Sequence, residues 1–592
     1  MTTVTLPPPV EIVIPSQAAA QVRPRLGRRV LRALRPREGR VFFLLAAATY
    51  LTAATILTLH YGVIDVDSMS RVANATYVLQ SRFPHLAAIG FVWNPLPSLA
   101  DLPFIPFAHF WPELKNHAFA GNITSSLFMA GAVTLMLGTL RDFGCSRPVR
   151  YALTVLFALN PMIVLFAANG MSEACMLFTL MLATRMLAKW LRTGDPSDLV
   201  RTGMALGLAY LARYEALAAG AATIGLVAAI SFIRGRSGVK SRLRDVVTDA
   251  LLVGFPFVVS VGLWAISSKV LVHQWFPTIS SSYGNTAQVG AAASELRHLT
   301  GQGTSEAFLY AANQLFGLEP TLFITIGAAA IFALHLRDNR ALAPLAILGS
   351  VLAFDVIAFL SGHSFGWLRF DISVIPLATL MVACIPAARV PAPKRRLRNP
   401  LLSACLTTGR LSVNGLLAAA AVLLLAITLP STWHTMMNHR LGREETHDLT
   451  AIFYPHQATD QDRQALNSLH VERQVAAYID SLHLRNGSVL TDSGDAYGVL
   501  ASTKDLKAFI ITSDLDFERA VADPPRFGVR YILTPEHAYY DAVQSAYPGI
   551  YDNGGGFSTL AKSWKGYGYS PAWRLYRVTT AAYVADHDTL RP

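Results

Sequence analysis

Residues 41–67 read VFFLLAAATYLTAATILTLHYGVIDVD, and this stretch decides the fold class of the chain. The part over 41–61 contains no Asp, Glu, Lys or Arg, and it is long enough to cross a bilayer, which takes about 17–25 apolar residues in a helix. Two carboxylates, Asp65 and Asp67, follow almost at once. The stretch therefore predicts a membrane-spanning helix that ends beside an acidic pair.

Similar apolar runs recur along the chain and predict a polytopic α-helical membrane protein with about eleven spans. Of the 592 residues, 52% are hydrophobic and 15% charged. Soluble globular proteins carry roughly 25% charged residues, so the composition argues against an ordinary soluble enzyme. The segment 95–111 contains four prolines, which favours a short interfacial or re-entrant segment over a twelfth span. The candidate spans lie near 41–61, 117–138, 149–167, 173–190, 202–213, 215–233, 249–271, 319–336, 341–361, 372–388 and 411–430.

Basic residues gather in short clusters between these runs and predict the orientation of the chain. The formal net charge of +12 arises largely from such clusters, which is typical of the positive-inside pattern and not of a nucleic-acid-binding protein. Residues 1–40 are interpreted as a basic cytoplasmic tail, too long and too basic for a cleaved signal peptide. Joining 202–233 into one span would place the basic cluster 234–244 outside, so two spans are preferred there.

This topology puts three long segments on the extracytoplasmic side of the cell membrane. They are 61–116, 273–319 and everything after 430. Residues 41–430 are expected to form the transmembrane catalytic domain, and 431–592 a small extracytoplasmic α/β domain with a mostly parallel sheet. No glycine-rich phosphate loop follows its first expected strand, so no nucleotide site is indicated. The four cysteines show no metal-ligand spacing, and none lies after 430. The expected strands lie at 488–492, 508–512, 529–534 and 573–578.

The first outer segment contains the residues that point most clearly to chemistry. It begins Asp65-Val-Asp67-Ser-Met-Ser-Arg71, and Trp93-Asn94-Pro-Leu-Pro follows downstream. Ionisable groups at a membrane boundary are costly and are often functional. The structural alternative is that Asp67 caps a helix beginning at Ser68 while Asp65 is a solvated turn residue. The spacing alone leaves both interpretations open.

This arrangement resembles the GT-C glycosyltransferases, polytopic enzymes that use polyprenyl-phosphate-linked sugars. The stretch from Asp67 to Arg71, with Ala73, is similar to the Asp-Glu-x-x-Arg-Tyr-Ala element of a bacterial branch, the lipid A aminoarabinose transferases and related protein mannosyltransferase-like enzymes. Asn94-Pro-Leu resembles the Lys-Pro-Pro-Leu of that branch. The chain differs in having Ser68 where the branch has Glu, and no Tyr after Arg71.

Four further positions fit such a site, each with a structural alternative. Glu173 opens a span and matches a second acid that GT-C enzymes often keep, although a helix N-terminus would also stabilise its charge. Arg213 lies at an outer turn next to Glu215, where an internal ion pair is the slightly favoured interpretation. His363 and Arg369 end another span, and Arg369 is either a phosphate ligand or an interfacial anchor.

The resemblance implies glycosyl transfer from a polyprenyl-phosphate sugar to a hydroxyl of a glycan, glycolipid or protein on the outer face. Asp67 is then the expected general base, Asp65 its neighbour and Glu173 a further acid, while Arg369 and Arg213 hold the donor phosphate. Asp65 and Asp67 could also bind a divalent cation such as Mg²⁺ or Mn²⁺, and this question stays open. Membrane lipids are expected partners and nucleic acid is not. The alternative function is a secondary transporter or lipid flippase. The remaining candidates for the substrate cavity are Arg71, Trp93, Asn94 and His363.

Overall fold

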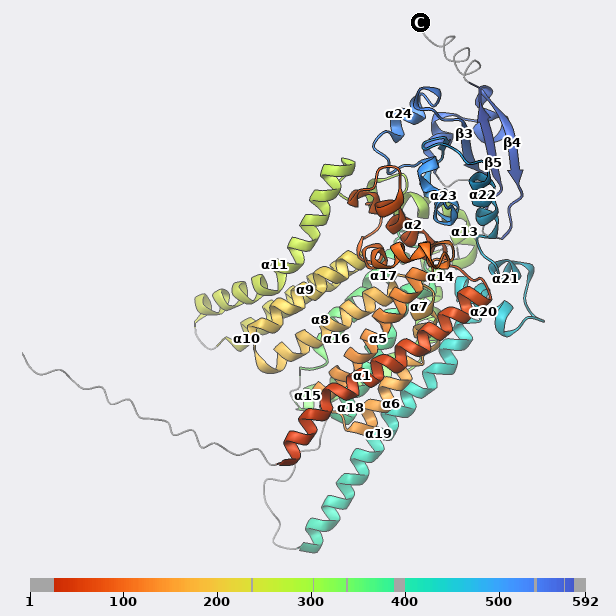
Figure 1. Cartoon of the computed structure of the whole chain (residues 1–592). Helices are drawn as coiled ribbons and strands as arrows, with labels where there is room; N and C mark the ends of the chain where they lie inside the picture. The colour runs from red at the N-terminus through yellow and green to blue at the C-terminus, as the bar shows by residue number, and fades with distance from the viewer. Residues whose placement is uncertain are drawn as a thin grey trace, which may run out of the picture.

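A bundle of long helices makes up most of the molecule, and a small sheet-containing domain covers one end of it (Figure 1). The computed structural model describes residues 26–235, 238–301, 303–336, 339–387, 400–536, 540–568 and 570–579. Residues 1–25 of the expected basic tail lie outside these described residues, and the rest of that tail begins the first helix.

Within the described chain, eight continuous helical runs are long and apolar enough to cross a membrane, and two bent helix pairs are as well. The single runs are α1 (Leu26–Ala54) with η1 (Thr55–His60), α5 (Phe119–Asp142), α8 (Glu173–Thr193), α10 (Ala216–Arg234), α11 (Val239–Val272), α16 (Leu342–Pro344) with η4 (Leu345–Gly349) and α17 (Ser350–Leu360), η5 (Leu368–Ser373) with α18 (Val374–Ala387), and α19 (Pro400–Met436). The bent pairs are α6 (Arg147–Ala158) with α7 (Pro161–Ala168) and α14 (Thr304–Leu318) with α15 (Leu322–Leu336).

The remaining predicted segment, 202–213, corresponds to α9 (Pro196–Ala212). With 17 residues, this helix is slightly shorter than the eight single runs. Each of the eleven predicted segments therefore coincides with a helix or a bent pair. The last apolar helix, α19, continues to Met436, a little beyond the expected boundary at 430.

Proline marks the break in each bent pair. Asn160 caps α7 by accepting a hydrogen bond from the backbone of Met162, and Pro161 is the first residue of that helix, which bends by 58° from α6. Pro320 follows α14, and α15 leaves it at 73°. The last part of the predicted long segment 273–319 is helical, because 304–318 forms α14.

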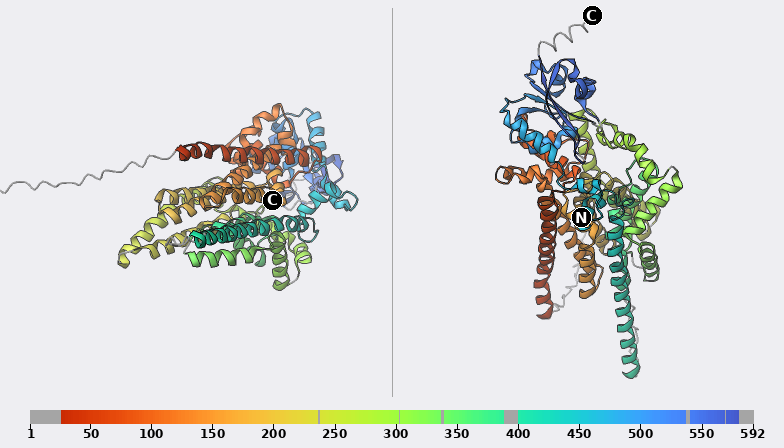
Figure 2. Two further views of the ribbon diagram at one scale, coloured as in Figure 1. Left: turned by 90° about the horizontal axis from the view of Figure 1, so that it is seen from below. Right: turned by 90° about the vertical axis from the view of Figure 1, so that its right-hand side faces the viewer.

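The helices differ in how completely the rest of the protein surrounds them. In the run Leu368–Ile385, which contains η5 and α18, 94% of the apolar stretch is buried, compared with 22% in α11. α1 and α19 extend away from the sheet-containing domain at the far end of the bundle (Figure 2). The run that begins at Leu368 therefore lies at the centre of the bundle, and α11 lies at its periphery.

The first outer segment folds into short helices that pack against the C-terminal domain. These are α2 (Val66–Gln80), η2 (Leu86–Ile89), α3 (Leu96–Asp101), η3 (Leu102–His109) and α4 (Glu113–Asn116). Met69 and Val72 of α2 share one buried core with Val475 and Trp573 of the C-terminal domain. Backbone hydrogen bonds from Asn467 and Ser468 to the turn after η1 add to this contact. The second outer segment contributes α12 (Pro277–Ser280) and α13 (Asn285–Thr300).

The C-terminal part is an α/β domain built on a five-stranded sheet with strand order β2-β1-β3-β5-β4. β1 pairs in parallel with β2 and β3, whereas β5 pairs antiparallel with β3 and β4. The sheet is therefore mixed, and the expectation of a mostly parallel sheet missed β4, an edge strand whose residues are largely exposed. The elements are α20 (Glu444–Phe453), α21 (Asp460–Ala465), α22 (His470–Ser481), β1 (Val489–Leu490), α23 (Ser493–Ser502), η6 (Leu506–Ala508), β2 (Phe509–Ile510), α24 (Phe517–Ala522), η7 (Pro525–Phe527), β3 (Tyr531–Pro535), α25 (Ala542–Ala546), α26 (Ile550–Asn553), η8 (Gly554–Gly556), β4 (Ser558–Trp564) and β5 (Trp573–Val578).

Candidate active site

Charged side chains from five separate segments meet where the helical bundle adjoins the C-terminal domain. The start of α2, the start of α8, the turn between α9 and α10, η5, and the start of α20 each contribute to this group. We call it the charged cluster. Its members are Asp67, Arg71, Glu173, Arg213, Glu215, Arg369 and Glu444.

The acidic pair after the first span has two different tasks. Asp65 is the N-cap of α2, because its Oδ1 accepts a hydrogen bond of 2.9 Å from the backbone N–H of Asp67. Asp67 lies in the first turn and its Oδ2 is 3.0 Å from Nη2 of Arg369. The alternative in which Asp67 caps a helix beginning at Ser68 was therefore wrong: the cap is Asp65, and Asp67 is free to pair across the cluster.

The packing around Ser68 explains why the chain differs there from the Asp-Glu element that it resembles. Ser68 is fully buried. Its Oγ lies against Gly121 of α5 and against Gly170, which has a left-handed backbone with φ of 80°. A Cβ added at Gly170 would be 2.0 Å from that Oγ, so both glycines are needed for the close approach. This close contact with two glycines favours a small side chain at position 68.

Arg213 lies on the inner side of the charged cluster between two deeply buried carboxylates. Its Nη1 is 2.5 Å from Oε1 of Glu173, and its Nη2 is 2.5 Å from Oε1 of Glu215. The two carboxylate side chains are only 1% and 2% accessible. The internal pair with Glu215 thus forms, and it extends to Glu173. Ser172 joins Arg213 to Arg71, since its Oγ accepts a hydrogen bond of 3.2 Å from each guanidinium.

Arg369 lies on the open side of the charged cluster. The face of its guanidinium is 4.1 Å from the centre of the Trp367 ring, an arrangement in which a ring attracts a cation. Besides Asp67, Nη1 is 3.4 Å from Oε2 of Glu444. Arg369 itself is 4% accessible, whereas the side chains of Asp67 and Glu444 are 39% and 40% accessible. The two acids of this side can therefore exchange partners with solvent or ligand, while the arginine is held in place.

Burial and neighbouring charges move the pKa values of the acids in opposite directions. Burial, followed by the charge of Asp67, raises the pKa of Asp65 well above its usual range. Burial acts in the same direction on Asp67, but the charges of Arg369, Arg71 and Arg213 outweigh it and hold the pKa of Asp67 below the ordinary value. One acid of the pair therefore favours its proton, while the other stays ionised beside an arginine.

The remaining candidates divide between the charged cluster and its surroundings. Arg71 belongs to the cluster through Ser172. Asn94 is buried and its amide donates to the backbone carbonyl of Tyr210, two residues before the end of α9. Trp93 is half-buried beside it. His363 is exposed, and its Nδ1 pairs with Ser361 of its own turn. Among the described residues, the hydrogen-bond partners of His363 are Ser361 and Asn285, which both lie outside the cluster.

Glu444 is the residue that sequence reasoning missed. It follows α19 in Arg443-Glu444-Glu445, which repeats the pattern of the first span, an apolar helix followed by two acids. This signal was present in the sequence, but the residues were assigned to the C-terminal domain. Glu445 is buried, and burial together with the charge of Glu444 raises the pKa of Glu445 well above its usual range.

The carboxylates of Asp65 and Asp67 already have partners within the protein that are not metal ions. Asp65 uses Oδ1 as a helix cap, and Asp67 uses Oδ2 in its ion pair with Arg369. Within the described parts of the chain, three metal-ligating side chains converge elsewhere, at His439, His447 and Asp462. A metal at Asp65 and Asp67 stays a prediction, because these contacts provide no third ligand for it.

Comparison with known proteins finds likeness in structure but none in sequence. No protein-family model and no curated protein matches the chain. Among solved structures, the chain is similar to ArnT from Cupriavidus metallidurans bound to undecaprenyl phosphate, with 12% identity and a TM-score of 0.47, covering 90% of this chain and 97% of that one. It is also similar to the oligosaccharyltransferase AglB from Archaeoglobus fulgidus in complex with an inhibitory peptide and a dolichol-phosphate, with 10% identity and a TM-score of 0.38, covering 85% and 70%.

Proposed function

We propose that this chain is an integral-membrane glycosyltransferase that moves a sugar from a polyprenyl-phosphate donor to an acceptor hydroxyl. The observation that carries the proposal is the ion pair between Arg369 and the accessible carboxylate of Asp67. The cation of this pair can stabilise a departing lipid phosphate. The carboxylate can separate from the cation and accept the proton of a hydroxyl.

Arg369 is proposed to bind the donor phosphate. Guanidinium groups match phosphate oxygens with two parallel hydrogen bonds, and such bonds are stronger where water is scarce. Nε of Arg369 has no hydrogen-bond partner among the described residues, and its carboxylate neighbour Glu173 is 3.9 Å away. The guanidinium therefore has donor capacity left for an anion. The contact with the Trp367 ring fixes the plane of the guanidinium, and the anion would bind in that plane.

Asp67 is proposed as the general base, activated when the donor arrives. In the ion pair with Arg369 its pKa is low, and a carboxylate of low pKa accepts protons poorly. A phosphate that takes over Arg369 removes this stabilising contact, so the pKa of Asp67 rises. Asp65, which already favours its proton, then lies next to a stronger base. Binding of the donor and preparation of the base are thereby coupled.

The proposed step is a single displacement with inversion. The acceptor oxygen forms a bond to the anomeric carbon while the bond from that carbon to the phosphate oxygen breaks. The electron pair leaves with the polyprenyl phosphate, which Arg369 stabilises, and the hydroxyl proton passes to Asp67. Arg213, already neutralised by Glu173 and Glu215, is proposed to hold the charged cluster together rather than to bind phosphate.

We place the charged cluster and the domain 431–592 on the extracytoplasmic side of the cell membrane, and the basic residues 1–40 in the cytoplasm. The supporting observation is the distribution of Arg and Lys along the sequence. Reporter fusions after Arg244 and Lys394 are expected to report a cytoplasmic location, and a fusion after Ser431 an external one. A cytoplasmic signal after Ser431 would contradict this orientation.

The test of the function is a transfer assay with purified protein in nanodiscs. The protein is incubated with a panel of labelled polyprenyl-phosphate sugars and with candidate glycan, glycolipid and peptide acceptors. Release of polyprenyl phosphate that depends on an acceptor, and that is lost in Asp67→Asn, is the expected result. A protein that moves the lipid across a bilayer without consuming it would instead be a flippase.

A further inference from the structure

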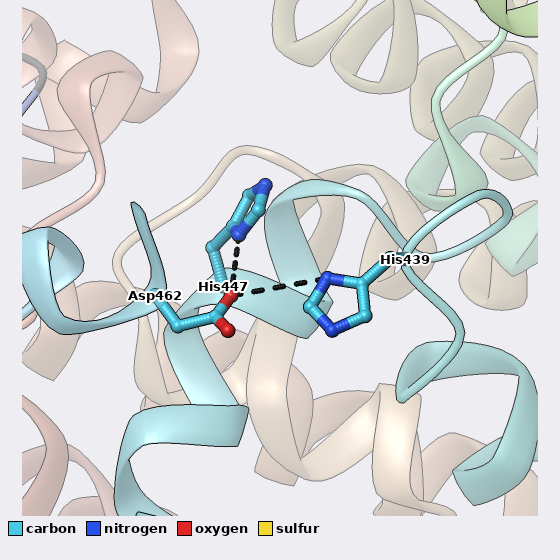
Figure 3. Close-up of side chains that lie close together, drawn as sticks. All are labelled: His439, His447 and Asp462. Atoms are coloured by element: carbon cyan, nitrogen blue, oxygen red, sulfur yellow. Dashed lines mark hydrogen bonds and ion pairs between the residues drawn. The ribbon is translucent and has the colours of Figure 1, made fainter. Parts of the chain in front are cut away.

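A second group of side chains with the chemistry of a ligand site lies outside the charged cluster, in the segment that joins α19 to the C-terminal domain. His439 stands in the turn after α19, His447 in α20 and Asp462 in α21 (Figure 3). One ligand atom of each residue lies within 4.8 Å of the ligand atoms of the other two. Among the described residues, His439, His447 and Asp462 form the group in which three metal-ligating side chains meet this distance.

We propose that His439, His447 and Asp462 bind one divalent transition-metal ion of the zinc class. Two imidazoles and one carboxylate are ligands that Zn²⁺ accepts, while Mg²⁺ and Ca²⁺ prefer sites made of oxygen atoms. The imidazole content therefore selects the class of metal. The proposal concerns binding only, so it stands apart from the reaction proposed above.

The distances leave room for an ion after small movements. Nδ1 of His447 is 2.6 Å from Oδ1 of Asp462, and Nδ1 of His439 is 3.9 Å from the same oxygen. Zinc bonds of about 2.0–2.2 Å in a tetrahedron separate neighbouring ligand atoms by roughly 3.3 Å. To bind the ion, the distance from His447 to Asp462 must increase and that from His439 to Asp462 must decrease, each by roughly half an ångström or slightly more. The ion would replace the hydrogen bond from His447 to Asp462.

The backbone around the three residues holds the ligands in place. Asp462 uses its other oxygen, Oδ2, to accept hydrogen bonds from the N–H and Oγ of Thr459, in a capping box at the start of α21. This contact fixes the carboxylate and leaves Oδ1 for the ion. His439 lies in a tight turn in which the side chain of Asn438 accepts from the N–H groups of Arg440 and Leu441. Ligands positioned in this way lose little freedom on binding.

The accessibility of the three side chains suits a site with a solvent-filled fourth position. The side chain of Asp462 is buried, that of His447 is 15% accessible and that of His439 is 50% accessible. An ion could therefore enter from the His439 side, and water would complete the coordination. Three protein ligands with one open position is a common arrangement for zinc.

The site would connect three elements near the charged cluster. His447 lies one turn after Glu444 on α20, and Glu444 is the acid that faces Arg369 at 3.4 Å. An ion shared by the turn after α19, α20 and α21 would fix α20 and hence Glu444. The metal thus acts as a cross-link that positions one wall of the charged cluster.

The experiment measures zinc binding to the full-length protein, purified without a polyhistidine tag and stripped with a chelator. Equilibrium dialysis against Zn²⁺ with elemental analysis should give one saturable ion per chain. His439→Ala and His447→Ala should each weaken zinc affinity by at least about tenfold. The matched control is His456→Ala, an exposed histidine of the same segment outside the group, which should bind zinc as the parent does.

A second measurement guards against variants that fold poorly. Zn²⁺ should raise the thermal unfolding midpoint of the parent and of His456→Ala, but not that of His439→Ala, whereas Mg²⁺ should affect all three proteins equally. The proposal is overturned by the absence of saturable zinc binding in the parent. It is equally overturned by parental affinity in both His439→Ala and His447→Ala, which would reduce the group to a His–Asp hydrogen bond beside a helix cap.

Discussion

The inner and open sides of the charged cluster contain the same chemical groups, one arginine between two acids, but they differ in exposure. On the inner side, Arg213 is 2.5 Å from both Glu173 and Glu215, and both acids are almost fully buried. On the open side, Arg369 is 3.0 Å and 3.4 Å from Asp67 and Glu444, whose side chains are about two-fifths accessible. The first arrangement is closed to a ligand, whereas the second can open.

This difference separates a structural role from a chemical one. A buried arginine cannot lose its partners without leaving uncompensated charge in a medium of low polarity, so the inner side resists change. The open side can exchange Asp67 for another anion, because the displaced carboxylate reaches water. Substitutions on the two sides should therefore affect different quantities, folding on one side and donor use on the other.

Arg213→Met is expected to have the largest effect, and on stability. The variant leaves Glu173 and Glu215 buried without their partner, which typically costs about 3–5 kcal/mol. Thermal unfolding in detergent, followed by tryptophan fluorescence, measures the loss. Arg463→Met is the matched control, because Arg463 pairs with Asp460 at the surface and the two side chains are 55% and 91% accessible, so the loss should stay below about 1 kcal/mol. Equal unfolding temperatures for the two variants would contradict a structural role for the inner side.

Asp67→Asn is expected to have the largest effect on catalysis. The amide keeps the volume of the carboxylate but cannot take the proton, so transfer should fall by about 10²-fold or more while the protein still folds. Initial rates with labelled donor measure this loss. Asp65→Asn is the control, and it should cost less, because an amide oxygen can still cap α2. A parental rate in Asp67→Asn would remove the residue from the mechanism.

Metal dependence can be tested with the same pair of variants. If Asp65 and Asp67 hold a divalent cation during the reaction, chelation should abolish transfer and both variants should lose activity to a similar degree. If they hold no cation, chelation should leave transfer unchanged, and Asp67→Asn should lose more activity than Asp65→Asn. Zinc bound at His439, His447 and Asp462 is monitored separately in these samples, so that its removal is not mistaken for loss of a catalytic ion.

Arg369→Lys should weaken donor use by about tenfold, because lysine keeps the charge but loses the planar pair of donors. Arg369→Ala should weaken it further, and the dependence on acceptor concentration should change little in either variant. Initial rate against donor concentration in nanodiscs separates these effects. If Arg369→Ala shows parental donor dependence, this residue is an interfacial anchor and does not bind the phosphate.

Asp448 lies in α20, four residues after Glu444. Asp448→Asn should have the smallest effect of these substitutions, and the effect is on how stability depends on pH. Burial, followed by the charge of Glu444, raises the pKa of Asp448 to about 7. Between pH ~4 and about 7 the folded chain keeps this proton while the unfolded chain loses it, so the parent loses stability as pH rises through that window. The variant has no such loss. Its unfolding midpoint should exceed that of the parent by about 1–2 °C at pH 8 and match it at pH 4. A larger difference at pH 4 would contradict the raised pKa.

The sequence predicted the helices well, since each of the eleven apolar segments corresponds to a helix or a bent pair in the structure. It missed β4, whose residues are mostly exposed and therefore lack the apolar pattern of a buried strand. It also assigned no helix to 304–318, which forms α14. The local composition was a poor guide to β4, because this strand forms by pairing with β5 and not by burial of its side chains.

The sequence by itself determined which segments are apolar enough to cross a membrane and where charged residues interrupt them. These are local properties, because the burial of a helix in lipid depends on its own side chains. Only the tertiary structure decided that Asp67 meets Arg369, 302 residues later, and that Glu173 turns to Arg213. Such pairs depend on how the helices cross and on small residues such as Gly170 that permit close contact, and no short stretch of sequence contains that information.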